Sequence, residues 1–199
     1  MNNRVRQAIG KTVSVFMLLM PLSVFADVDV PEKGNQQSAG DCIMAFDHEM
    51  KKLHASKNVP LCELTTGKPL LIINTASHCG FTPQFKQLEA IHQEYKDKGL
   101  VVIGFASNSF KQEAKSEEAA ADICYVNYGV SFTMLAPSPV RGDNANEVFK
   151  WLAEKSKAPR WNFNKYLVSA DREAVKHFGS MTKPSGKKFR AAIESIIES

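Results

Sequence analysis

The sequence predicts an α/β fold in which a mixed central sheet is covered by helices on both faces. Three observations support this prediction. Short runs of apolar and β-branched residues recur along the chain, and stretches with apolar residues at helical spacing separate them. Towards the C-terminal end, two strand-like runs follow each other across a turn before one last helical stretch. Alternating strands and helices favour parallel pairing, and the closing hairpin adds antiparallel strands.

The first 26 residues have the composition of a secretory signal peptide. Basic residues without an acidic one precede an apolar run over 13–25, and the end of this run fits cleavage after Ala26. The run is too short for a comfortable membrane span. We therefore expect an exported protein, periplasmic or secreted, with no stable membrane association after cleavage of residues 1–26.

Charge and composition argue against several classes of partner. Without the first 26 residues, the 25 basic residues of the full chain fall by three to 22, against 21 acidic residues. A nearly neutral chain gives no reason to expect binding to nucleic acid or to an acidic membrane surface. The histidines share no metal-ligand spacing with one another or with a cysteine pair, so the sequence predicts no metal and no cofactor.

The rest of the chain divides into a polar leader and one domain. Residues 27–40 have no hydrophobic period and include Pro31, Gly34 and Gly40, so we expect a flexible leader there. The domain then extends over 41–199, a length that supports one hydrophobic core.

The elements of this domain follow from its periodicity. The first is a short amphipathic helix over 43–53, where apolar residues recur at helical spacing. Further along, Ser116 marks a helix start and Gly129 suits a left-handed C-terminal cap. The other predicted elements are, in order, a strand at 70–76, a helix at 84–97, a strand at 100–105, a helix at 116–128, a strand at 130–135, a helix at 146–156, strands at 166–169 and 174–178, and a helix at 185–198. This arrangement is thioredoxin-like.

Cys79 is the candidate nucleophile. It follows the predicted strand at 70–76 and precedes a helix, which places a thiol at a strand-to-helix junction. There the unpaired backbone N–H groups and the helix dipole favour the thiolate, which is the reactive form. Thr82 stands where a Cys-x-x-Cys motif would have its second cysteine, which argues against a disulfide reductase and leaves a lone nucleophile.

Two motifs resemble those of the glutathione peroxidase family. The family's Cys- or selenocysteine-bearing motif is similar to NTASHCGFT at 74–82, and its second signature is similar to WNFNKYLV at 161–168. The resemblance implies a peroxidase in which Cys79 attacks the O–O bond and becomes a sulfenic acid. It also implies that Trp161 and Asn162 donate hydrogen bonds toward the reacting sulfur and the departing oxygen.

The family's further hydrogen-bonding partner is a glutamine in a strand-end motif, which FASNSF at 105–110 resembles. Ser109 stands at the position that we assign to this glutamine, and its hydroxyl offers one donor on a shorter arm. Ser109 would act through a water, or Gln112 would swing in to replace it. We expect this departure to affect the catalytic rate more than the reaction class.

Cys124 is the candidate resolving cysteine. Its surroundings, DICYVNYGV at 122–130, resemble the resolving-cysteine region of the two-cysteine, thioredoxin-using branch of the family, which implies a disulfide between Cys79 and Cys124. The two Cα atoms must come within about 7 Å for this bond, which a helical cysteine rarely achieves without backbone movement. We therefore predict that the segment 116–128 unwinds locally during turnover.

The two remaining cysteines, Cys42 and Cys62, allow a structural disulfide in an oxidising compartment. Such a bridge would tie the first predicted helix to the chain before the first strand of the sheet. In the chain-entropy account it would stabilise the fold by about 3 kcal/mol. Two free thiols are the alternative.

The segment 137–160 does not resemble the longer insertion of tetrameric, glutathione-dependent members, so we expect an open site and a monomer or weak dimer. Such a site accommodates large hydroperoxides, with a thioredoxin-like protein or glutathione as the reductant. In this segment Arg141 and Arg160 are the candidates for binding a glutathione carboxylate. Two other functions remain open, namely a non-enzymatic peroxide sensor that relays oxidation to a partner protein, and a periplasmic thiol-disulfide oxidoreductase.

Overall fold

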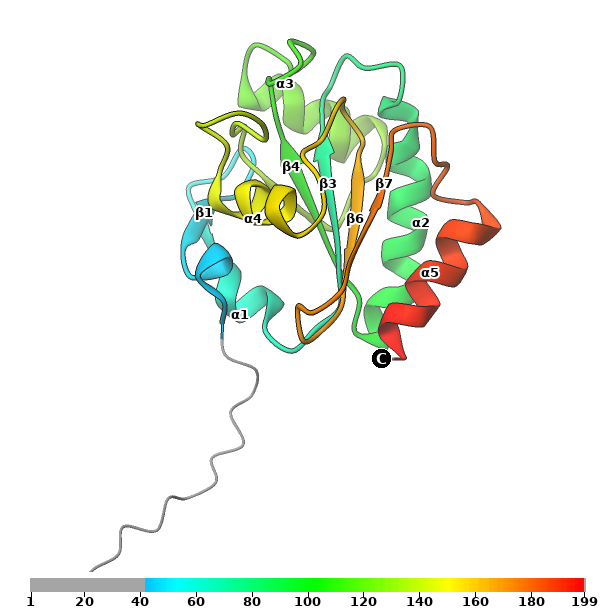
Figure 1. Ribbon diagram of the computed structural model, residues 1–199. Helices are drawn as coiled ribbons and strands as arrows, with labels where there is room; N and C mark the ends of the chain where they lie inside the picture. The colour runs from blue at the N-terminus through cyan, green and yellow to red at the C-terminus, as the bar shows by residue number, and fades with distance from the viewer. Residues whose placement is uncertain (1–41, 199) are drawn as a thin grey trace, which may run out of the picture. The chain divides into compact units, whose positions relative to one another are not determined.

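A five-stranded mixed sheet forms the centre of the computed structural model, which describes residues 42–198 (Figure 1). Its strands lie in the order β5-β4-β3-β6-β7. They are β3 (Leu70–Thr75), β4 (Val101–Ala106), β5 (Thr133–Leu135), β6 (Lys165–Val168) and β7 (Val175–Phe178). β4 is parallel to β3 and β5, whereas β6 is antiparallel to β3 and β7. The predicted mixed sheet is therefore confirmed.

Helices cover both faces of the sheet, as predicted (Figure 1). All of β3 is buried, and its side chains alternate between two apolar clusters. Leu71 and Ile73 belong to the cluster of α2 (Phe85–Tyr95) and α5 (Lys187–Ile197). Leu70 and Ile72 belong to the cluster of α4 (Glu147–Lys155), α1 (Leu61–Thr65) and the 3₁₀ turn η1 (Met44–Phe46). Two further 3₁₀ turns, η2 (Thr82–Gln84) and η3 (Lys96–Lys98), flank α2.

The capping residues read from the sequence act as expected. The Ser116 hydroxyl accepts from the N–H of Ala119, at the start of α3 (Glu117–Ala121). Gly129 has φ +65°, the left-handed conformation predicted for it. Between them, α3 continues as a π-helix, η4 (Asp122–Asn127), so the helix predicted over 116–128 changes its hydrogen-bonding pattern midway.

The amphipathic helix predicted over 43–53 is wrong. Only η1 is helical there, and β1 (Glu49–Lys51) instead pairs antiparallel with β2 (Asn58–Pro60). The hairpin also contacts the edge of the sheet, because the N–H of Leu53 donates to the Met134 carbonyl and the N–H of Ala136 to the Lys51 carbonyl. These pairings with distant residues override the helical spacing of the apolar side chains.

Two predictions concern residues that lie outside the described range, namely the signal peptide over 1–26 and the flexible leader over 27–40. Within residues 42–198, no helix is long and apolar enough to cross a membrane.

Candidate functional site

Cys79 lies in the tight loop between β3 and η2, and Thr82 holds this loop together. The Cys79 N–H donates to Thr82 Oγ1 at 3.1 Å, and the Thr82 hydroxyl donates to the Ala76 carbonyl at 2.9 Å. The N–H of Phe81 donates a hydrogen bond to Cys79 Sγ across 3.5 Å. Cys79 is 7% exposed, so its sulfur lies just beneath the surface as a free thiol.

Asn74, near the end of β3, positions the Trp161–Asn162 segment. The side-chain amide of Asn74 donates to the Trp161 carbonyl at 3.0 Å, and the backbone carbonyl of Asn74 accepts from the Phe163 N–H at 2.7 Å. Phe163 has φ +59°, a strained conformation for a residue other than glycine, and these bonds hold it. The Trp161–Asn162 segment thereby lies beside the C-terminal end of β3, next to Asn74, which is five residues before Cys79 in the sequence. Asn162 is fully buried, whereas Trp161 is 43% exposed and can be reached from solvent.

Gln112, the alternative to Ser109, contacts both Asn162 and the residue before Cys79. The Asn162 side-chain amide donates to Gln112 Oε1 at 2.9 Å, and the Gln112 carbonyl accepts from the N–H of His78 at 2.9 Å. Gln112 thus joins the residue before Cys79 to Asn162. Because its Oε1 is occupied by Asn162, its Nε2 group is left as a hydrogen-bond donor.

The assignment of Ser109 to the position of the family's glutamine stays a prediction, and the structure gives the contacts of this residue. Its hydroxyl accepts from the Val140 N–H at 3.0 Å and from the Ser107 hydroxyl at 3.1 Å, so it serves the neighbouring loop.

Glu113 fastens the 108–115 loop to the cysteine loop, although no motif in the sequence pointed to this residue. Its carboxylate accepts from both the N–H and the hydroxyl of Ser77, two residues before Cys79, and from the Ala114 N–H at 2.8 Å. Bonds from ionised groups to N–H donors are among the stronger ones in proteins, so this contact helps to fix the nucleophile's loop.

Ser180 is a second positioning residue that the sequence gave no sign of. Its hydroxyl donates to the Asn162 carbonyl at 2.6 Å, and its own carbonyl accepts from the Gln84 side chain at 2.8 Å. Gln84 ends η2, directly after the cysteine loop. Buried Lys165 holds the loop around Ser180, because its ammonium donates to the carbonyls of Ser180 and Thr182. Burial lowers the pKa of Lys165 to about 7.

Cys124 lies in η4 as a second free thiol, 2% exposed, in the same apolar cluster as Cys79. Its thiol donates to the Ala121 carbonyl at 3.6 Å. Burial raises the pKa of Cys124 to about 12, and the negative charge of Glu113 adds to this effect. In this conformation Cys124 is a protonated, sheltered thiol, so it is a poor nucleophile.

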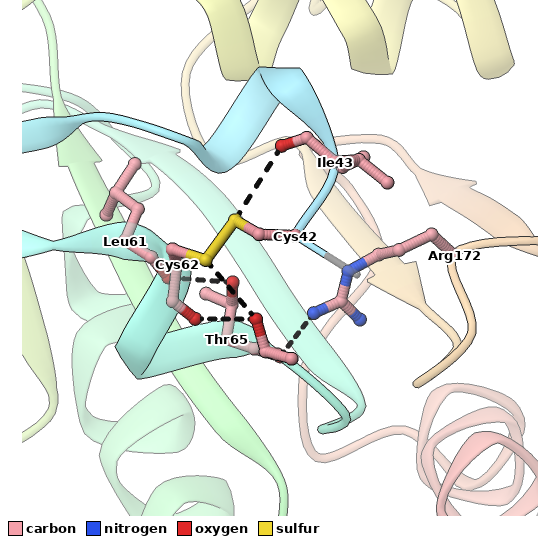
Figure 2. The surroundings of a disulfide bond; sticks show 7 residues. Cys42, Ile43, Leu61, Cys62, Thr65 and Arg172 are labelled. Carbon is pink, nitrogen blue, oxygen red and sulfur yellow. Dashed lines mark hydrogen bonds between the residues drawn. A yellow bond between two sulfur atoms is a disulfide. The ribbon is translucent and has the colours of Figure 1, made fainter. Parts of the chain in front are cut away.

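Cys42 and Cys62 form a disulfide with a Cα–Cα distance of 5.6 Å, in agreement with the pairing predicted from the sequence (Figure 2). Beside it, the Arg172 guanidinium donates to the carbonyls of Thr65 and Lys68 and lies over the Phe46 ring. The bridge and the guanidinium together attach the first residues of the domain to α1 and to the turn between β6 and β7. An Asp47 carboxylate oxygen lies within 4.8 Å of both sulfurs, which are not available as thiolate ligands while they are bonded to each other.

The thioredoxin-like fold and the free thiol of Cys79 in the loop after β3 fit a thiol peroxidase. Comparison with known proteins identifies the family. The sequence profile of the family described as "Glutathione peroxidase" matches residues 45–153. The chain therefore belongs to the glutathione peroxidase family, and it is a peroxidase that uses thiol chemistry.

Relatives with similar sequences include fungal and bacterial proteins. "Glutathione peroxidase-like peroxiredoxin 2" of Saccharomyces cerevisiae is 44% identical over 126 residues, which are 60% of this chain and 78% of that protein. "Hydroperoxy fatty acid reductase gpx1" of Synechocystis is 38% identical over 143 residues, which are 66% of this chain and 83% of that protein.

Solved structures agree with the fold. The structure described as "Crystal structure of Trgpx in apo form" superposes with a TM-score of 0.61 at 30% identity, over 80% of this chain and 98% of that one. A secreted Mycobacterium tuberculosis disulfide oxidoreductase has a TM-score of 0.53 at 16% identity, over 74% of this chain and 97% of that one. The latter likeness concerns the thioredoxin-like fold alone.

Proposed function

We propose that Cys79 reduces hydrogen peroxide and organic hydroperoxides. The thiolate attacks the distal oxygen of the O–O bond, the O–O electron pair leaves with the other oxygen, and protonation of that oxygen releases water or an alcohol. Cys79 is left as a sulfenic acid. The observation that carries this proposal is the contact of Gln112 with both Asn162 and the residue before Cys79, which gathers two carboxamides at the nucleophile's loop.

Cys124 then resolves the sulfenic acid. Its sulfur attacks the sulfur of Cys79, hydroxide leaves and takes up a proton as water, and a disulfide forms between the two residues. The buried state of Cys124 requires that η4 opens first. One feature favours opening: the Tyr125 hydroxyl is buried and has no hydrogen-bond partner among the described residues, so it gains water when the helix loosens.

A dithiol or thiol donor completes the cycle by reducing this disulfide, for which a thioredoxin-like protein or glutathione is the candidate. We further propose an exported protein, in the periplasm or secreted, because residues 1–26 have the composition of a signal peptide. We also propose that it is a monomer or weak dimer with an open site. The 43% exposure of Trp161 supports access by bulky hydroperoxides.

Peroxide consumption by the mature protein tests the cycle, with glutathione and a thioredoxin system offered in parallel. Cys79→Ser should abolish consumption, and Cys124→Ser should allow a single turnover without sustained reduction by the thioredoxin system. Mass spectrometry of the peroxide-treated protein should find a peptide linked through Cys79 and Cys124. Retained activity in Cys79→Ser, or the lack of this linked peptide, would contradict the corresponding step.

The two alternative functions lose support from the structure. The sensor hypothesis drew on a weakened site with Ser109 in place of a glutamine, and in our proposal Gln112, which is hydrogen-bonded to Asn162, supplies that carboxamide. A thiol-disulfide oxidoreductase needs a second thiol near Cys79, whereas buried Thr82 holds the loop there through its hydroxyl. Insulin reduction by the purified protein is the direct check, and we expect none.

A further inference from the structure

The helical segment that carries Cys124 is held only weakly by the hydrophobic core. α3 continues directly into η4, and the buried residues of the two are Ala120, Ala121 and Cys124. Tyr125 and Tyr128 pack against the core only in part. Small side chains remove little apolar surface from water when they are buried. Polar contacts at the two ends of the segment therefore contribute much of what keeps it closed.

Glu117, the first residue of α3, fastens the N-terminal end of the segment to the β1–β2 hairpin. Its carboxylate accepts two hydrogen bonds from the Lys51 ammonium, at 2.8 and 3.0 Å, and a third from the His54 N–H at 3.1 Å. The hairpin itself is fixed by its hydrogen bonds to the edge of the sheet, and the Cys42–Cys62 bridge encloses it. Glu117 thus ties a weakly packed helix to a firmly held hairpin.

The C-terminal end of the segment is held by a different kind of contact. The N–H and the hydroxyl of Ser131 both donate to the Glu89 carboxylate, at 2.8 and 2.6 Å, and Glu89 belongs to α2, one face of which is buried. No cation takes part in these two bonds. Lys51 and Glu117, in contrast, form an ion pair whose side chains are 50% and 31% exposed. Because salt screens exposed ion pairs, the two ends of the segment should respond differently to ionic strength.

We infer that Glu117 is a positioning residue for the resolving step, because its bonds to the hairpin keep α3 and η4 closed around Cys124. When Lys51 releases the carboxylate, the N-terminal end of the segment can unwind, while Ser131 stays bound to Glu89 as the hinge. The inference rests on the proposed role of Cys124, and it names the contact that governs how often this thiol becomes accessible. Glu117 acts through the segment and not on either sulfur.

Alkylation of Cys124 measures the opening without any peroxide. In Cys79→Ser, with the Cys42–Cys62 bridge intact, Cys124 is the one free thiol among the four cysteines of the chain, and iodoacetamide reaches it only when the segment opens. Lys51→Gln in this background should raise the alkylation rate about threefold, the value of an exposed ion pair. Lys51→Arg retains the charge and should leave the rate nearly unchanged. Raised salt should speed the alkylation only while Lys51 is present.

The same substitution with Cys79 present connects the opening with the catalytic cycle. After the reduced protein is mixed with an equimolar amount of hydrogen peroxide, rapid quenching and mass spectrometry follow the sulfenic acid on Cys79 and the Cys79–Cys124 disulfide separately. Lys51→Gln should form the disulfide about threefold faster and the sulfenic acid at the wild-type rate. A merely structural role of the ion pair would not speed one step and leave the other unchanged.

Glu147→Gln is the matched control, because Glu147 is the first residue of α4 and also pairs with a lysine, Lys150, at 2.8 Å. It should change neither rate, and thermal melts of all variants should have similar midpoints. An unchanged alkylation rate in Lys51→Gln, or an equal increase in Glu147→Gln, overturns the inference. So does an increase in Ser131→Ala alone, since the release would then occur at the other end. If alkylation responds as expected but the wild-type protein forms no Cys79–Cys124 disulfide, the proposed cycle fails instead.

Discussion

The side-chain amide of Asn162 donates a hydrogen bond to Gln112 Oε1 at 2.9 Å, across 50 residues of sequence. The backbone carbonyl of Gln112 also accepts from the N–H of His78, the residue before Cys79. These contacts favour Gln112 over Ser109 as the side chain that assists the nucleophile, and substitutions of the two residues can test this.

Gln112→Ala should lower kcat/KM for hydrogen peroxide by about 100-fold, the usual cost of removing one preorganised donor from a charge-stabilising site. Ser109→Ala should leave this value nearly unchanged, because the Ser109 hydroxyl contacts Ser107 and Val140 instead. Steady-state kinetics with hydrogen peroxide and a thermal melt of each variant provide the comparison. A larger loss in Ser109→Ala than in Gln112→Ala would restore the original assignment.

Ser180→Ala should slow the oxidation of Cys79 about tenfold in single turnover, because the Asn162 carbonyl loses its partner and the segment shifts. Reduction of the disulfide should proceed at the wild-type rate. Ser180→Thr retains a hydroxyl and should recover most of the oxidation rate. Ser185→Ala is the control, since that hydroxyl contacts Gln87 at the surface. A loss of thermal stability with normal oxidation in Ser180→Ala would show a merely structural role.

Because of Cys124, the free energy of unfolding should fall as the pH rises through the alkaline range. The pKa of Cys124 lies at about 12 in the folded protein, against an ordinary value of 9.0, so both states hold the proton below pH 9. As pH rises from 9 towards 12, only the unfolded chain loses the proton, and the free energy of unfolding falls. Urea unfolding at several pH values should show a steeper fall in Cys79→Ser than in Cys79→Ser with Cys124→Ser. Equal slopes would mean that Cys124 titrates normally.

Replacing both Cys42 and Cys62 with alanine should lower the free energy of unfolding by about 3 kcal/mol, as expected when a bridge across 20 residues is removed. Hydrogen peroxide turnover should persist at low temperature, because α1 precedes the N-terminal end of β3 while Cys79 follows its C-terminal end. Urea titration with and without a disulfide reductant supplies the measurement. An unaltered unfolding midpoint on reduction of the wild-type bridge would contradict this role.

Most of the sheet and its helices could be predicted because their patterns are local. A buried strand such as 70–75 shows itself by its β-branched run, and Ser116 and Gly129 mark helix ends by their own chemistry. The hairpin of β1 and β2 could not be found in this way. Besides its own pairing, the hairpin is held by hydrogen bonds to residues near Met134, more than 80 positions away, and no pattern within 43–53 encodes that partner.

The candidate site likewise contains residues that sequence motifs reveal and residues that they do not. Cys79, Trp161 and Asn162 lie in motifs that can be recognised from the sequence alone. Gln112, Glu113 and Ser180 act through loop conformation, where a difference of one residue moves a side chain by several ångströms. A polar residue inside an otherwise apolar strand was the available signal for Asn74, whose side chain binds the Trp161–Asn162 turn.

In the proposed cycle, the π-helical turn around Cys124 sets the lifetime of the sulfenic acid on Cys79. While Cys124 stays buried in that turn, a second peroxide molecule can oxidise the sulfenic acid to the sulfinic acid, which thiols do not reduce. The opening rate of η4 would then limit the peroxide concentration that the enzyme survives. Substitutions that stiffen this turn should shorten the working life of the protein under oxidant excess.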